Sequence, residues 1–149
     1  MSADMLRLRS RARTGTVAVL LGFAAMAAAA QETGRMVMTI GTQRFTVTLE
    51  DNPTARAFVQ SMPVVLEMAD LNGNEKHARL PRSLPTAPIR PGTIRAGDLL
   101  LYGDATLVVF YETFSSSYSY TRIGRIDEPA ALARALRPGS ARIAFAVPQ

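Results

Sequence analysis

Aromatic and polar side chains that could form a binding groove are concentrated between positions 102 and 122. The group comprises Tyr102, Phe110, Tyr111, Glu112, Tyr118, Tyr120 and Arg122, and all of these except Tyr111 are our candidate ligand-binding residues. Because side chains alternate between the two faces of a strand, several of them could share one face. Aromatic walls with one arginine suit an extended peptide or a small anionic ligand, since guanidinium binds carboxylate through two hydrogen bonds. In the alternative interpretation, the rings fill the core and Arg122 pairs with an acid at the rim.

The sequence offers few side chains suited to acid–base, nucleophilic or metal catalysis. His77 is the only histidine, and no carboxylate flanks it at metal-ligand spacing, so it is more typical of an exposed loop residue than of a general base. Glu67, Asp70, Asp98 and Asp104 lack the spacing of paired catalytic acids and suit turns. The chain has no cysteine, which excludes disulfides, thiolate metal sites and a cysteine nucleophile. We therefore predict no metal site and expect no cofactor.

The N-terminal segment has the pattern of an export signal. Four arginines between positions 7 and 13 precede an apolar stretch, residues 17–27, that is too short to span a bilayer comfortably. Ala28-Ala29-Ala30 supplies the small side chains that a signal peptidase accepts, and the chain becomes polar at Gln31. We predict a signal peptide over residues 1–30, cleaved after Ala30, and a periplasmic or secreted protein without a membrane anchor. An uncleaved anchor or a buried alanine-rich helix is the alternative.

Part of the chain's positive charge lies in that segment. The chain has 17 basic and 12 acidic side chains; residues 1–30 hold four arginines and one aspartate, so 13 and 11 remain and the net charge falls to +2. The remaining arginines and lysines are scattered singly rather than clustered, so we expect no nucleic-acid partner. Residues 31–149 suit a single domain.

The first half of this domain predicts strands and one helix. Residues 36–49 alternate apolar and polar side chains on both sides of Gly41-Thr42, which indicates a hairpin. Asn52-Pro53 has the cap residue and first-turn proline of a helix that ends near Pro63. Residues 64–68 suit a buried strand, and residues 70–74 interrupt it.

A proline-rich segment follows, over residues 72–97. It contains Pro81, Pro85, Pro88 and Pro91, which exclude a long helix or a central strand. We interpret it as one long ordered loop. Loops of this length are often functional, so the segment is a leading place for a site; a structural cover over the sheet is the alternative.

The last third of the chain predicts more strands. Residues 98–102 and 105–111 are nearly continuously apolar and are joined through Gly103-Asp104, which indicates a hairpin of central strands. Residues 118–126 form a further strand, a short helix capped by Asp127 follows, and residues 141–147 form the final strand. The element order predicts a mainly β domain, a closed or nearly closed antiparallel barrel with two short helices on its ends.

Several short stretches of sequence are more specific than the order of elements, because together they indicate a resemblance to a protein family. They are Asn74-Glu75-Lys76, Leu80-Pro81, Ser83-Leu84-Pro85-Thr86, Pro91-Gly92-Thr93-Ile94, Ala96-Gly97-Asp98-Leu99, Phe114-Ser115 and Ser117-Tyr118-Ser119-Tyr120-Thr121-Arg122. Together they resemble the cyclophilin-like family of small bacterial domains, over roughly residues 36–136. The resemblance implies a closed antiparallel cyclophilin-like β-barrel of eight strands, capped by two helices and related in fold to the cyclophilin peptidyl-prolyl isomerases.

The resemblance also implies where a site would lie. Cyclophilin isomerases place an arginine, a Phe-Met-x-Gln segment, a second phenylalanine, a tryptophan and a histidine around one shallow groove. Arg79 or Arg82 would stand for that arginine and Phe110 for the second phenylalanine. The Phe-Met-x-Gln segment and tryptophan are absent, and Tyr120 stands about where the histidine would be. Our first hypothesis is a domain that binds a peptide or small molecule near Phe110, Tyr120 and Arg122; the alternative is an exported peptidyl-prolyl isomerase.

Overall fold

The computed structural model describes residues 34–136 and 138–149. The predicted signal peptide, residues 1–30, lies outside them. The described elements are, in order, β1 (Arg35–Ile40), β2 (Gln43–Leu49), α2 (Pro53–Gln60), β3 (Val64–Leu71), β4 (Glu75–Arg79), β5 (Thr93–Ile94), β6 (Asp98–Tyr102), β7 (Thr106–Phe110), β8 (Phe114–Ser115), β9 (Thr121–Ile126), the 3-10 helix η1 (Pro129–Ala131), α3 (Leu132–Ala135) and β10 (Ala141–Ala146).

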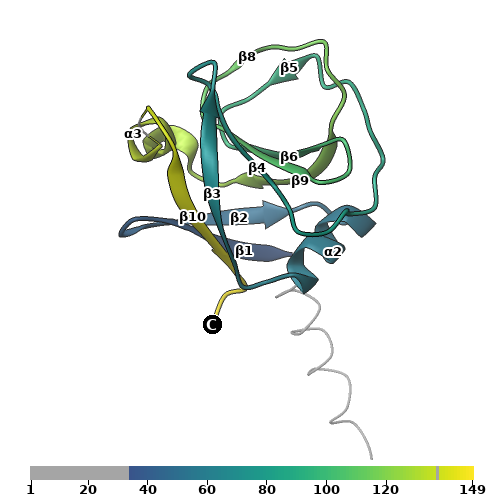
Figure 1. Ribbon diagram of the computed structural model, residues 1–149, viewed down its shortest axis with the longest axis horizontal. Coiled ribbons are helices and arrows are strands. Elements are labelled where there is room, and N and C mark those ends of the chain that lie inside the picture. The colour runs from purple at the N-terminus through teal and green to yellow at the C-terminus, as the bar shows by residue number, and fades with distance from the viewer. Residues whose placement is uncertain (1–33, 137) are drawn as a thin grey trace, which may run out of the picture.

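The strands form a closed barrel, as the element order predicted. Eight of the described strands pair in the order β1-β10-β3-β4-β7-β6-β9-β2, and β2 pairs back with β1 to close the ring (Figure 1). Every neighbouring pair is antiparallel. The remaining two, β5 and β8, form a separate two-stranded sheet. The mainly β fold class, with a closed antiparallel barrel and two short helices, is confirmed.

Both predicted hairpins are present, and their burial follows their sequence patterns. In β1 and β2 the buried side chains alternate with exposed or half-buried ones, and Met38 pairs with Phe45 across the two strands. Strands β6 and β7 are instead buried at nearly every residue, as their continuous apolar sequence indicated. They are therefore covered on both faces, one of which must lie outside the barrel.

Helix α2 begins where the sequence predicted it. The Asn52 side chain accepts a hydrogen bond of 2.8 Å from the backbone N–H of Ala55, and Pro53 occupies the first turn. The apolar face of the helix packs into the core, where the Phe58 ring meets the Phe145 ring of β10 edge-on with 5.6 Å between centroids. Among the described residues, no helix is long and apolar enough to cross a membrane.

The second helical segment also packs into the core, but its predicted cap is wrong. Leu132 and Leu136 belong to the main hydrophobic core. Asp127 does not cap the helix, because η1 begins after Glu128 without a side-chain cap. Instead, the Asp127 carboxylate accepts a hydrogen bond of 2.5 Å from the Thr48 hydroxyl of β2. A long-range bond between β2 and the segment after β9 has replaced the local one.

The prediction of one long loop over residues 72–97 is also wrong. Strand β4 lies within that range and pairs with both β3 and β7, and β5 pairs with β8. Asn72 and Gly73 have φ values of 55° and 64°, a left-handed backbone typical of tight hairpin turns, and lie in a three-residue loop, 72–74, between the paired Leu71 and Glu75. Strand β3 therefore continues through Asp70 to Leu71. The four prolines all lie after β4, in the connection to β5, where no described barrel strand needs their missing N–H.

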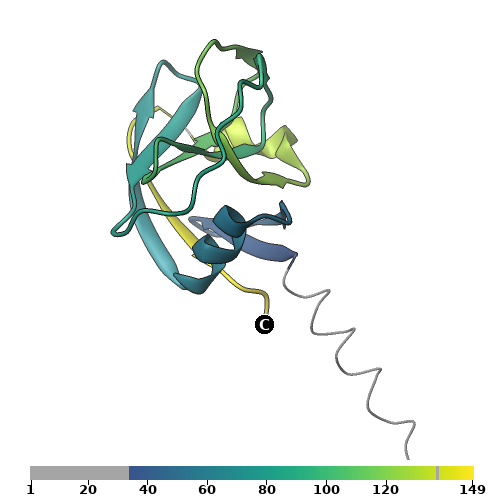
Figure 2. The ribbon, with the colours of Figure 1, turned by 90° about the vertical axis from the view of Figure 1, so that its right-hand side faces the viewer.

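A second apolar cluster lies outside the barrel. Alternate residues of β6 and β7 belong to the main core, and those between them belong to a smaller group. Because consecutive residues of a strand face opposite sides, that group lies on the outer face. This outer cluster comprises Ile94, Leu100, Val108, Phe110 and Tyr120, with Phe114 packed against it. The β5–β8 sheet covers it, at the opposite end of the molecule from α2 (Figures 1 and 2).

Candidate functional site

A pocket of about 570 Å³ lies beside the outer cluster, and we call it the aromatic pocket. Its aromatic lining residues are Tyr102, Phe114, Tyr118 and Tyr120. Its polar lining comes from the β3–β4 hairpin, in particular Asn72, Asn74, Glu75 and His77, and from the serines at 115–117. The pocket therefore joins two segments far apart in the sequence, the β3–β4 hairpin and the chain between β8 and β9.

The ring of Tyr102 contacts both other tyrosines, Tyr118 edge-on and Tyr120 in a tilted arrangement. The ring of Tyr102, on β6, lies 6.1 Å from that of Tyr118 at 87° and 5.8 Å from that of Tyr120 at 57°, between centroids. Tyr120 in turn meets the fully buried Phe110 at 5.6 Å and 90°. Edge-to-face contacts are favourable for aromatic rings. The exposed fraction falls from Tyr118, at 62%, to Tyr120, at 6%, so the wall runs from solvent down to the outer cluster.

The β3–β4 part of the lining carries a carboxylate in an unusual setting. Glu75 begins β4, pairs with Phe110 of β7 and is only 9% exposed. Burial, and then the negative charge of Asp70, raise the pKa of the Glu75 carboxyl above its usual value. Beside it, the side-chain oxygen of Asn74 is buried without a hydrogen-bond partner among the described residues. The two residues that carry these hydrogen-bond acceptors both line the pocket.

Tyr120 lies near these acceptors and stays protonated. Burial raises the pKa of its hydroxyl group, a hydrogen bond with Ser116 acts in the opposite direction, and the Glu75 charge raises the pKa further. The net direction is upward, so at neutral pH Tyr120 is a neutral side chain that can donate a hydrogen bond.

A second hollow adjoins the aromatic pocket. It has a volume of about 540 Å³ and is lined by Thr86 and Pro88 of the proline-rich connection and by Asp104 of the β6–β7 turn. Tyr102 and Tyr120 line both hollows, so the two meet at this tyrosine pair. Ile89 pairs with Tyr120 through backbone hydrogen bonds and so fixes this part of the connection beside the pair.

The candidate ligand-binding residues are distributed unequally with respect to the pocket. Tyr102, Tyr118 and Tyr120 line it, and Phe110 packs behind Tyr120. Glu112 and Arg122 are exposed and do not line it. The backbone oxygen of Arg122 accepts a hydrogen bond of 2.8 Å from the Asn52 side chain, so this residue lies by the start of α2. The structure thus brings the aromatic members together and leaves the charged members outside.

The two arginines suggested by the resemblance also lie away from the pocket lining. Arg79 ends β4 and Arg82 follows in the loop, and both are exposed. His77, which we expected to be an exposed loop residue, is half-buried on β4, where it lines the pocket. That expectation is wrong because residues 75–79 are a barrel strand.

Sequence reasoning missed the polar wall, Asn74, Glu75 and His77. A signal for its position was present, because Asn72-Gly73 is the strongest two-residue hairpin pattern and predicts a strand directly after it. The burial of Glu75 had no such signal, since it depends on the β5–β8 sheet and its neighbours covering the outer face.

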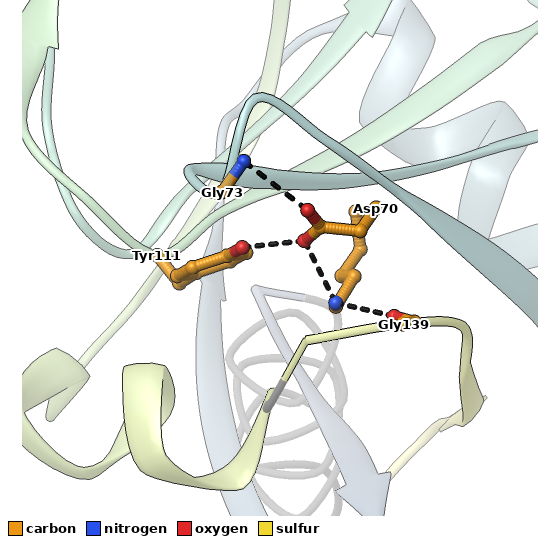
Figure 3. Close-up of polar contacts among 5 residues, drawn as sticks. Asp70, Gly73, Tyr111 and Gly139 are labelled. Atoms are coloured by element: carbon orange, nitrogen blue, oxygen red, sulfur yellow. Dashed lines mark hydrogen bonds and ion pairs between the residues drawn. The ribbon is translucent and has the colours of Figure 1, made fainter.

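A separate polar network lies inside the barrel. The side chain of Lys76 is fully buried, and its Nζ donates to Asp70 Oδ1 at 2.8 Å and to the Gly139 carbonyl oxygen at 2.6 Å. The Tyr111 hydroxyl donates to the same Oδ1, and the Gly73 N–H donates to Oδ2 at 3.1 Å (Figure 3). The bond from Lys76, followed by that from Tyr111, lowers the pKa of Asp70, whereas burial chiefly raises that of Tyr111. The network joins β3, β4, the end of β7 and the turn before β10.

No cluster of three or more potential metal-ligating side chains occurs within residues 34–136 and 138–149. The described residues therefore offer no ready metal centre, and the aromatic pocket presents aromatic rings, hydroxyl groups, amides, one imidazole and one carboxylate.

The fold and the pocket together define a closed eight-stranded antiparallel barrel domain with an aromatic pocket on its outer face. The chain belongs to the cyclophilin-like family, whose model matches residues 38–146. This confirms the resemblance found in the sequence. A solution structure of a hypothetical protein from Archaeoglobus fulgidus is similar, with a TM-score of 0.48 and 16% identity, covering 76% of this chain and 94% of that one. No curated protein matches the chain.

Proposed function

We propose that this chain is an exported binding domain that holds a peptide or a small molecule in the aromatic pocket. The observation that carries the proposal is the aromatic surface left open to solvent there: Tyr102 is 48% exposed and Tyr118 is 62% exposed. Large apolar side chains grouped in a concave, polar-rimmed site are typical of ligand-binding surfaces. Leu71, which is 45% exposed, lines the same pocket.

The shape of the surface supports an elongated ligand. The aromatic pocket and the adjoining hollow meet at Tyr102 and Tyr120, so an extended chain could place neighbouring side chains in the two hollows. A small molecule would occupy the aromatic pocket alone. Because Arg122 does not line the pocket, the reason for expecting an anionic ligand no longer applies.

The export component of the proposal rests on the sequence. The arginines, the short apolar stretch and Ala28-Ala29-Ala30 form a signal-peptide pattern. A domain in the periplasm or outside the cell would meet peptides and small molecules there, without a membrane anchor after signal removal.

A thermal-shift screen of peptides and small molecules, on protein produced from the full-length chain, tests the binding proposal. A ligand at about 100 times its Kd stabilises the folded state by about 2.7 kcal/mol, which is readily measured as a rise in Tm. We expect Tyr118→Ser to abolish the shift, because this side chain lines the pocket and is exposed enough to be changed without unfolding the protein.

Val65→Ser is the matched control, since Val65 is 48% exposed on β3 and does not line the pocket. It should keep the shift, and equal shifts in the two variants would contradict the proposed site. The isomerase alternative lacks an arginine at the pocket, because neither Arg79 nor Arg82 lines it. Uncatalysed proline isomerisation takes tens to hundreds of seconds, so acceleration in a protease-coupled assay of the same protein would be evident and would favour that alternative.

A further inference from the structure

The charge balance of the aromatic pocket constrains the ligand. Glu75 is the only acidic residue among the described residues that line it, and no lysine or arginine lines it. The carboxylate is nearly buried, and among the described residues burial and the Asp70 charge, both of which raise its pKa, are not offset by a cation or a hydrogen-bond donor. A nearly buried carboxylate without such a partner is costly unless the group is neutralised or meets a positive charge.

A second hydrogen-bond acceptor without a partner also favours a ligand that donates hydrogen bonds. The Asn74 side-chain oxygen is the one buried side-chain polar atom in the described residues that has no hydrogen-bond partner. A buried acceptor left unpaired costs about 1–3 kcal/mol, and native structures contain few of them. Asn74 and Glu75 are adjacent in the sequence and line the same pocket. Both would be satisfied by a group that donates several hydrogen bonds and accepts none.

The aromatic wall favours the same kind of group. Tyr102, Tyr118 and Tyr120 meet at 57° and 87°, so their rings present faces in different directions around one corner. A cation placed over such faces is attracted by the negative charge density of the rings. An ammonium group has three N–H donors, no acceptor and a positive charge. The apolar side chains of Leu71, Val108 and Phe114 could contact a methylene chain attached to it.

We propose that the aromatic pocket binds a primary alkylammonium group, with the ammonium between the Glu75–Asn74 acceptors and the tyrosine corner. This inference rests on the proposed binding function and narrows it to one chemical class. The group could belong to a free alkylamine or to a lysine side chain of a peptide, and both sources share the chemistry that the pocket recognises.

Calorimetric titration of the purified full-chain product at pH 8, where an ordinary imidazole carries little charge, tests the inference. The probes are n-butylammonium, the uncharged 1-butanol and the anionic butyrate. Nα-acetyl-lysine amide and its Nε-acetylated form make the second set. We expect binding of the two primary amines, with Kd values at least about tenfold below those of the uncharged and anionic probes, because a hydrogen bond to a charged group contributes about 1.5–3 kcal/mol. Binding of the lysine derivative without binding of n-butylammonium would identify a peptide as the source.

Two variants assign the interaction to its residues. Glu75→Gln keeps the size of the side chain and removes its charge, and we expect it to raise the Kd for n-butylammonium about tenfold or more. Glu50→Gln is the matched control, because Glu50 is exposed and does not line the aromatic pocket. Tyr118→Leu keeps an apolar side chain but removes the ring face, and should raise the Kd about threefold.

The outcomes distinguish failure of the alkylammonium preference from failure of the proposed binding function itself. Equal Kd values for Glu75→Gln and Glu50→Gln would overturn the inference, as would butyrate or 1-butanol binding as tightly as the amine. If such a neutral or anionic probe bound and lost affinity in Tyr118→Leu, the pocket would still be a binding site and the cation preference alone would fail. If no probe of any charge bound and the peptide and small-molecule screen also gave no shift, both would fail.

Discussion

Lys76 illustrates how one side chain can organise the interior of this barrel. It is fully buried, and its hydrogen bonds reach Asp70 on β3 and Gly139 before β10. Its ammonium also lies 5.4 Å from the centroid of the Tyr111 ring. The Asp70 side chain is 21% exposed, but removing its charge leaves the buried ammonium without its carboxylate, which costs more than the pair contributes when intact. We therefore expect the network to be a stability determinant rather than part of the binding site.

The Asp70→Asn variant tests this role. At pH 7 we expect it to lower the free energy of unfolding by about 3 kcal/mol, since it removes the charge that faces the buried ammonium. Asp51→Asn is the matched control, because Asp51 pairs with Arg56 where both side chains are well exposed, and such pairs contribute little to stability. Urea unfolding of both variants measures the difference. A cost for Asp70→Asn no larger than that for Asp51→Asn would contradict the assignment.

The same network should make stability depend on pH in a defined direction. The folded-state pKa of Asp70 lies below its unfolded value, first because of the hydrogen bond from Lys76. The contribution of Asp70 is therefore complete above the unfolded pKa of about 3.9 and is lost as the pH falls through the folded pKa. The stability gap between the parent protein and Asp70→Asn should consequently be smaller at pH 3 than at pH 7. A gap that stayed constant would show that the Asp70 charge does not contribute.

At the scale of elements, the β3–β4 hairpin connects the interior network to the outer pocket. Consecutive residues of β4 face opposite sides, so Lys76 points into the barrel while Glu75 and His77 line the aromatic pocket outside it. The turn at Asn72-Gly73 sets the register of β3 against β4, and this register determines which β4 side chains face the barrel interior and which face the pocket. A shift of one residue would exchange the two faces.

Substitutions at Gly73 test how strongly this turn specifies the hairpin. Its φ of 64° is unfavourable for a residue with a Cβ, although no other atom lies within 4 Å of where that Cβ would be. Gly73→Ala should therefore cost about 1 kcal/mol of unfolding free energy from backbone conformation alone. Gly73→Asn should cost less, since asparagine tolerates the left-handed region. Chemical denaturation compares the two, and equal costs would argue against the conformational explanation.

The contrast between β4 and the other hairpins shows what the sequence could predict. Residues 36–49 and 98–111 carry clear alternating or continuous apolar patterns, and both were predicted correctly. Strand β4 reads Glu-Lys-His-Ala-Arg and has no such pattern, because its inward lysine is paired and its outward glutamate is covered by distant segments. Burial of polar side chains by tertiary contacts leaves no periodic signal in the sequence.

The candidate site could likewise be predicted only in part from the sequence. The density of aromatic residues between positions 102 and 122 correctly indicated that several of them gather, because tyrosines 102, 118 and 120 are in ring contact. Strand β9 begins only at Thr121, whereas the sequence suggested a strand from 118. Which charged residues reach the pocket depends on that boundary and on the path of the loops. Such features are set by three-dimensional contacts rather than by spacing along the chain.

At the scale of the whole molecule, closure of the barrel bears on how the domain could meet a partner. Strand β1 pairs with both β2 and β10, so the barrel has no unpaired edge strand through which another chain could add a strand. The separate β5–β8 sheet keeps free edges, but the barrel has none, so we expect a ligand of the barrel to be held by side chains in a surface hollow. Strand β1 begins at Arg35, a few residues after the predicted cleavage site, so cleavage after Ala30 would leave the barrel intact.

The export proposal can be tested independently of any ligand. We expect the protein recovered from the periplasm or culture medium, after expression of the full-length chain, to begin at Gln31, as measured by intact mass and N-terminal sequencing. Ala29→Leu changes the middle position of the small-x-small pattern and should still be cleaved after Ala30. Combining Ala27→Leu, Ala29→Leu and Ala30→Leu removes the small residue before the cut from the frames that end at positions 27, 29 and 30, and should leave the longer chain attached to the membrane. Recovery of an uncleaved cytoplasmic protein from the parent chain would refute export, and the binding proposal would then concern intracellular amines.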